Sequence, residues 1–166
     1  LEAVVSAVDG AAPVVATDSA VAAMTSIATG ASARALPEVD EGRTRLDVGW
    51  DPELAADHAA VSGGPVNPGR HRVPDVLVGL AWPAVFAVIA DARTATGLPV
   101  VEGMLDLVHL DHAVAVGALP AEPTTLAVEA RLAGVEDCEV GRVVTVDVVV
   151  GEVATMRERF AIRGRT

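Results

Sequence analysis

The feature that most constrains this fold is a helical segment with no polar face. Residues 82–92 (WPAVFAVIADA) place apolar side chains on every side of a helix, and Pro83 suits a first helical turn. A helix at the surface needs a polar face toward water, so this helix must be buried all round. The uncharged run that contains most of it, Val76–Ala90, is too short to span a bilayer. Other elements of the chain therefore have to enclose it.

The chain after Gly97 supplies those elements, because its residues alternate at a period of two. The alternation predicts strands at Leu105–Ala115, Thr124–Leu132, Val140–Val150 and Val153–Ile162. The third of these is rich in β-branched residues, and Gly151-Glu152 fits a tight hairpin turn into the fourth. In that last strand the residues expected to face the core are Ala154, Met156, Phe160 and Ile162.

The N-terminal third has a different character. Residues 1–36 are rich in Ala and Val, and Asp18 or Ser19 could cap a helix there. This segment is too small to form a hydrophobic core by itself. Residues 43–48 alternate and suggest a short strand. We expect residues 1–50 to be a helical linker or the tail of a preceding domain, and residues 51–166 to be the folded domain.

One buried helix followed by antiparallel strands is typical of an α+β fold. The pattern favours a single hot-dog fold, in which an antiparallel sheet wraps round an apolar helix, with an N-terminal helical or linker extension. Other α+β sandwiches fit the same order of elements.

Composition excludes several classes of function. The formal net charge of −11 repels phosphate, which argues against binding to nucleic acid or to an anionic membrane surface. Cys138 is the single cysteine, so no internal disulfide is possible and a reducing cytoplasm fits the chain.

Four stretches carry a resemblance to a known family. They are VLVGLAWPAVFAVI (76–89), DLVHLDHAV (106–114), EVGRVVTVDVVV (139–150) and ERFAIRGRT (158–166). Residues 76–166 resemble the first hot-dog segment of the dehydratase region in type I fatty acid synthases, of the bacterial single-chain and fungal kind.

That resemblance implies a segment of a multienzyme rather than a free enzyme. The parent dehydrates (3R)-3-hydroxyacyl chains carried on acyl carrier protein, and its catalytic Asp/His pair lies on a later segment. This segment would have no catalytic residues of its own. Its partners would be downstream hot-dog segments and the enoyl reductase, in a large cytoplasmic homo-oligomer. FMN and NADPH belong to other domains of such a synthase, and no cofactor is expected here. The residues that would line the acyl tunnel are Trp82, Val85, Phe86 and Ile89.

One stretch of the chain resembles the catalytic motif of that later segment but lacks its aspartate. Residues 61–71 (VSGGPVNPGRH) resemble it, but Gly64 stands where the aspartate should be and can transfer no proton. The remaining candidates are His109 and Asp111, which share one face of a regular strand and would form a hydrogen-bonded pair. A contact between domains, acid/base chemistry and a metal site all fit them, although a metal would need further ligands.

Two alternatives to the synthase segment stay open. One is a free-standing homodimeric hot-dog hydratase or thioesterase that acts on thioesters and depends on His109. The other is a binding or structural module of a different multienzyme.

Overall fold

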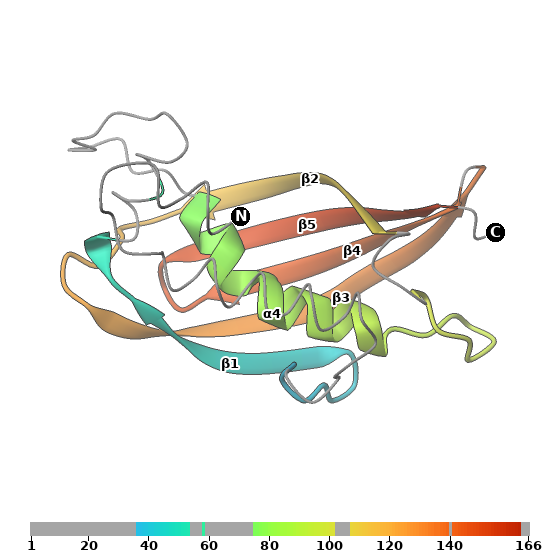
Figure 1. The fold of residues 1–166 in the computed structure, drawn as a ribbon, viewed down its shortest axis with the longest axis horizontal. Coiled ribbons are helices and arrows are strands. Elements are labelled where there is room, and N and C mark those ends of the chain that lie inside the picture. The colour runs from blue at the N-terminus through green and yellow to red at the C-terminus, as the bar shows by residue number, and fades with distance from the viewer. Residues whose placement is uncertain (1–35, 54–57, 59–74, 102–106, 140, 164–166) are drawn as a thin grey trace, which may run out of the picture.

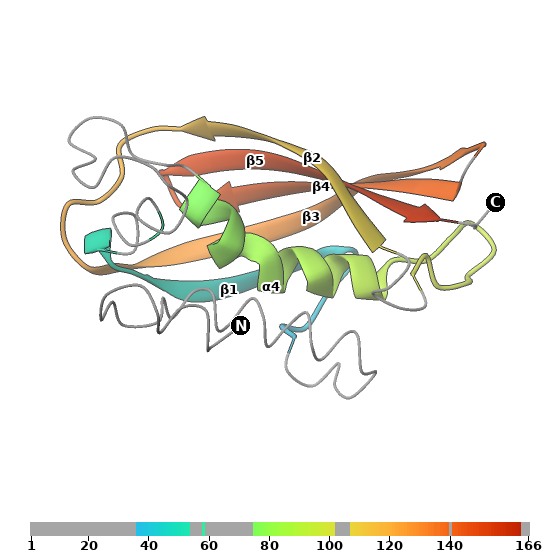
Figure 2. The same cartoon turned by 45° about the horizontal axis from the view of Figure 1, so that its top comes forward.

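The computed structural model describes residues 36–53, 58, 75–101, 107–139 and 141–163, and each statement below concerns these residues. Its elements are β1 (Arg43–Trp50), α4 (Asp75–Asp91), β2 (Leu107–Val116), β3 (Thr124–Cys138), β4 (Gly141–Val150) and β5 (Ala154–Arg163). The strands form one antiparallel sheet in the order β1-β3-β4-β5-β2. Helix α4 runs along the inner face of this curved sheet (Figures 1 and 2).

The core lies between the helix and the sheet. Side chains from nearly every side of α4 are buried, which confirms that the helix has no polar face. They pack against inward-facing residues of the strands, among them Val128, Val146 and Phe160, each no more than 2% exposed. The expectation that Pro83 opens the helix was wrong, because α4 begins at Asp75 and Pro83 lies inside it. Figure 1 shows α4 bent along its length, as an interior proline that removes one backbone hydrogen bond would cause.

The predicted strands are confirmed, with changes at their ends. Strand β3 continues to Cys138, beyond the predicted end at Leu132. The hairpin between β4 and β5 turns at Gly151, whose φ of 47° lies in the left-handed region that glycine adopts readily.

The boundary expected between residues 50 and 51 needs correction. Strand β1 ends at Trp50 and pairs with β3 along its whole length, so residues 43–50 belong to the sheet and not to a linker. The alternation within residues 43–48 predicted this strand correctly, whereas the Ala- and Val-rich composition of the preceding segment led to the wrong boundary. The expected helix in residues 1–36 and the mimic motif at 61–71 lie outside the described residues.

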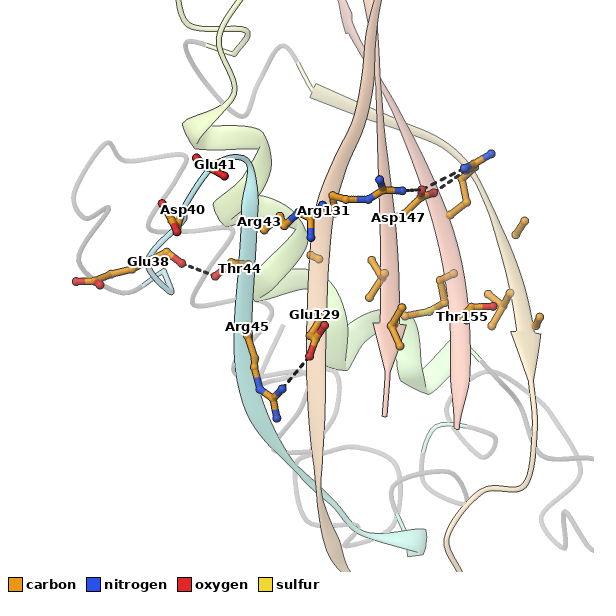
Figure 3. A pocket seen from close by; sticks show the side chains of 18 residues that line it. Glu38, Asp40, Glu41, Arg43, Thr44, Arg45, Glu129, Arg131, Asp147 and Thr155 are labelled. Carbon is orange, nitrogen blue, oxygen red and sulfur yellow. Dashed lines mark hydrogen bonds and ion pairs between the residues drawn. The ribbon is translucent and has the colours of Figure 1, made fainter. Parts of the chain in front are cut away.

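The outer face of the sheet carries ion pairs that link neighbouring strands. Asp147 on β4 accepts hydrogen bonds from Arg131 on β3 (2.8 Å) and from Arg157 on β5 (2.7 and 3.2 Å). Arg45 on β1 bonds to Glu129 on β3 at 2.8 Å. These side chains line a shallow groove of about 1480 Å³ across the strands (Figure 3). None of the helices described is long and apolar enough to cross a membrane.

Candidate active site

A bulge in the edge strand β2 decides which of its side chains reach the interior. His109 pairs with Phe160 and Asp111 pairs with Arg159, so Leu110 is an additional residue in β2. The extra residue shifts the alternation by one position. His109 therefore lies on the inner face together with His112, which pairs with Glu158.

The predicted pair of His109 with Asp111 was wrong for this reason. A regular strand would place both on one face, but the bulge turns Asp111 to the outer face. There its carboxylate accepts a hydrogen bond from Arg159 at 3.1 Å.

The inner face of β5 provides the carboxylate that His109 contacts instead. Glu158 is 0% exposed and lies in the inward-facing series of β5, between Met156 and Phe160. The Nε2 atom of His109 lies 2.9 Å from the Oε2 atom of Glu158, within hydrogen-bond distance. Sequence reasoning missed Glu158, although its position in the alternation marked it as a carboxylate in an otherwise apolar series.

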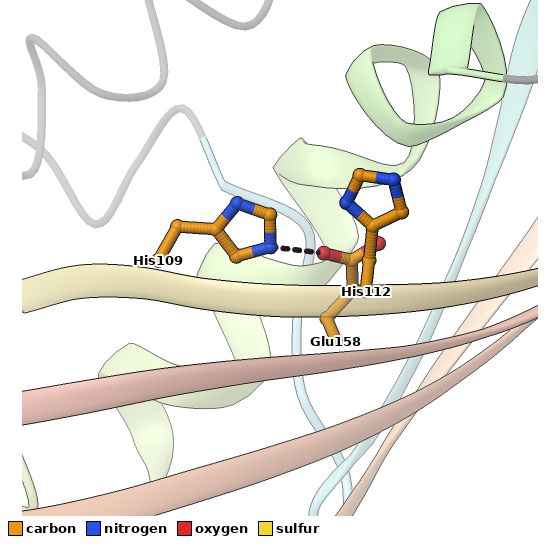
Figure 4. A group of neighbouring side chains, drawn as sticks. All are labelled: His109, His112 and Glu158. Atoms are coloured by element: carbon orange, nitrogen blue, oxygen red, sulfur yellow. Dashed lines mark hydrogen bonds and ion pairs between the residues drawn. The ribbon is translucent and has the colours of Figure 1, made fainter.

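The second histidine connects the site to the start of the helix. His112 Nε2 lies 3.5 Å from Oδ1 of Asp75, in the first turn of α4. The rings of His109 and His112 stack, with centroids 5.5 Å apart and planes within 9°. Figure 4 shows the His109 ring beside the Glu158 carboxylate, joined to it by the hydrogen bond, and the His112 ring close to the same carboxylate. Each histidine side chain is 31% exposed, so the site is open to solvent on the side of β2.

The surroundings of Glu158 favour retention of a proton. Burial raises the pKa of the Glu158 carboxyl, because the charged form loses its hydration. Charge interactions with His109 and His112 and the hydrogen bond from His109 oppose that rise, while the charge of Asp111 adds to it. Among the residues described, Oε2 has a hydrogen-bond partner and the buried Oε1 has none. The pair is thus arranged for proton exchange between a carboxyl group and an imidazole.

Aromatic rings surround the pair. The ring of His109 lies 4.9 Å from that of Phe160 and 6.4 Å, edge-on, from that of Trp82. Phe86 contacts both Trp82 and Phe160. Two of the four residues predicted to line an acyl tunnel therefore border this site. The other two, Val85 and Ile89, are buried in the core at 0% and 1% exposure. That these four residues line an acyl tunnel stays a prediction.

The same cluster has the donor types of a metal site. His109, His112 and Glu158 each offer a ligand atom within 4.8 Å of the others. Two imidazoles and a carboxylate are ligands that divalent transition metals accept. Glu158 is the third donor that the sequence alone did not provide.

Comparisons with known proteins bear on the fold. No protein-family model matches the chain, and no curated protein matches it. Among solved structures, a MaoC-like dehydratase from Phytophthora capsici is similar over 75% of this chain and 48% of its own, with 13% identity and a TM-score of 0.53. The chain thus spans about half the length of that protein. The fold is a hot-dog fold.

Two further solved structures show weaker similarity to this chain. The PaaI protein of E. coli matches over 90% of this chain and 97% of its own, with 14% identity and a TM-score of 0.49. The (R)-hydratase of A. caviae that is involved in PHA biosynthesis matches over 75% and 98%, with 17% identity and a TM-score of 0.37.

Proposed function

We propose that this hot-dog domain adds water to, or removes water from, acyl thioesters, with Glu158 and His109 as its acid and base. The observation that carries the proposal is the 2.9 Å contact between a fully buried carboxyl group and a half-buried imidazole. Such a pair holds one exchangeable proton, so at any moment one member is an acid and the other a base. Reversible hydration needs both at once.

The chemistry balances with these groups alone. During hydration the basic member takes a proton from water while the water oxygen bonds to the β-carbon of an enoyl thioester. The acidic member then gives its proton to the α-carbon. The hydrogen bond between His109 and Glu158 lets the proton return from one to the other, which resets the pair. Dehydration follows the same steps in reverse.

The test is an activity assay on the purified chain with enoyl-CoA and 3-hydroxyacyl-CoA thioesters of several lengths. Hydration is followed by the loss of the ultraviolet absorbance of the conjugated enoyl group. We expect Glu158→Gln and His109→Ala each to lower kcat by about 100-fold or more, the usual contribution of a positioned acid or base. Asp111→Asn is the matched control, because this neighbour of His109 on β2 faces away from the site. Its kcat should stay within about twofold of the wild type.

Two further outcomes of this assay bear on rival mechanisms. Release of free thiol in place of hydration would assign the pair to a thioesterase and overturn the hydratase proposal. The acid/base mechanism also predicts that a chelator leaves activity unchanged. Loss of activity with EDTA, restored by a divalent metal, would assign His109, His112 and Glu158 to a metal centre instead.

The synthase segment remains the second candidate, on one observation. The stretches 139–150 and 158–166, which carry the resemblance best, contribute strand β4 and the second half of β5, and Glu158 belongs to the latter. In this proposal the chain shapes an acyl tunnel and contacts neighbouring domains without turnover. Its test is the mass of the native polypeptide. A product far larger than 16.9 kDa, with fatty acid synthase peptides on both sides, would support it. A product of that mass would refute it.

A further inference from the structure

Two buried polar atoms near His109 have no hydrogen-bond partner among the residues described. They are the indole Nε1 of Trp82 and the carboxyl Oε1 of Glu158. A buried donor or acceptor without a partner costs free energy, and most such groups in folded proteins are paired with protein atoms or with water. The indole Nε1–H of Trp82 can only donate a hydrogen bond, whereas the carboxyl Oε1 of Glu158 can accept one. Both residues contact the imidazole of His109.

The other tryptophan of the chain provides a contrast. Trp50 is 2% exposed and donates its Nε1–H to the carbonyl oxygen of Pro120 at 3.0 Å. One of the two indoles is thus satisfied internally, whereas the other, beside the acid/base pair, has no acceptor within the part of the chain that the structure describes.

The position of the Trp82 indole is fixed by its neighbours. Its ring meets that of His109 edge-on, at an interplanar angle of 82°, and that of Phe86 at 55° with centroids 5.7 Å apart. Trp82 lies next to Pro83 within α4. A donor held by ring contacts in apolar surroundings is preorganised for a ligand and loses little entropy when one binds.

We propose that the indole N–H of Trp82 donates a hydrogen bond to the carbonyl oxygen of a bound acyl thioester. An N–H group needs an acceptor, and the thioester carbonyl gains negative charge when its α-carbon or its carbonyl carbon reacts. The inference rests on the proposed function and adds to it the residue that receives the reactive end of the substrate.

The first test is heteronuclear NMR of the indole N–H groups in the wild-type chain. The ligands are two unreactive analogues of acyl-CoA. In one, a methylene group replaces the thioester sulfur, so the carbonyl is kept as a ketone. In the other, an alkyl thioether, the carbonyl is absent. We expect the ketone to shift the Trp82 proton downfield while the thioether leaves it nearly unchanged. Trp50 should not move with either ligand, and Trp50→Phe and Trp82→Phe assign the two signals.

The second test compares affinity and turnover in Trp82→Phe, which keeps an aromatic ring and removes the donor. The wild type should bind the ketone more tightly than the thioether, and the variant should bind both alike. Loss of one such donor lowers kcat by roughly 100-fold to 1,000-fold in known oxyanion sites, and we expect about 10-fold to 100-fold here with a smaller change in KM. Trp50→Phe should retain its kcat, because that indole bonds to Pro120.

The outcomes separate this inference from the proposed function. Binding of the ketone without a shift at Trp82, or full kcat in Trp82→Phe beside an inactive Glu158→Gln, overturns the role of Trp82 alone. The same shift with both analogues would mean that a water molecule accepts the indole hydrogen bond, and this also overturns it. If neither analogue binds, both proposals fail. Because the NMR test uses the wild-type chain, misfolding of a variant cannot obscure the result.

Discussion

In the proposed function, Glu158 serves chemistry at a cost in stability. Its carboxyl group is 0% exposed and has a single hydrogen bond among the described residues, so it loses hydration that its contacts replace only in part. Folded proteins retain such groups mainly at functional sites. The neighbouring imidazole provides both a partial compensation and a route for the proton.

The raised pKa of Glu158 predicts how stability should depend on pH. The folded state keeps the proton to a higher pH than the unfolded chain, where the carboxyl titrates near 4.5. The contribution of the protonated Glu158 carboxyl to stability is therefore complete below the pKa of the unfolded chain. It is lost as pH rises through the pKa of the folded state. Urea unfolding from pH 4 upward should show the wild type losing stability relative to Glu158→Gln, which cannot titrate. A constant difference between the two proteins across that range would contradict the raised pKa.

At the scale of the element, the bulge in β2 determines the composition of the site. It allows His109 and His112 to share the inner face although two residues separate them. A regular strand would direct one of them outward. The side chain of Leu110, the additional residue, is 46% exposed and contributes little to the core.

Deletion of Leu110 should therefore be tolerated. Removal of the additional residue leaves His109, Asp111 and His112 in their present pairings with β5 and restores a regular ladder. We expect a change of no more than about 1 kcal/mol in the free energy of unfolding, and retained activity. Deletion of Ala113, which lies beyond the bulge, breaks the alternation between His112 and Val114 and should cost much more. Equal losses in the two deletion variants would contradict the register described.

At the scale of the whole molecule, the strands could be predicted from their period of two residues and the helix from a run of apolar residues with no polar face. The alternation in Val144–Val150 and the apolar helix mark one shared core, and this core forms. The site could not be predicted in the same way. A bulge adds one residue without any signature in the pattern, so the partner of His109 was assigned to Asp111 and not to Glu158.

The outer ion pairs hold three strands of the molecule together through Asp147. The hydrogen bond from Arg157 lowers the pKa of Asp147, with Arg131 acting in the same direction. Its stabilising contribution is present above the pKa of the unfolded state and is lost as pH falls through the lower pKa of the folded state. Asp147→Asn should reduce stability at neutral pH by up to about 1 kcal/mol. The loss of stability in Asp147→Asn should exceed the loss in Asp111→Asn and should disappear in strong acid. Thermal unfolding of the two variants at several pH values measures both effects.

The bulge at Leu110 also bears on how such a site can persist. Elsewhere in β2, insertion or deletion of one codon would exchange the residues on one side of it between the core and the surface. At the bulge, loss of one residue leaves His109, Asp111 and His112 in their pairings with β5. A change in chain length at this position therefore keeps the acid/base pair in place.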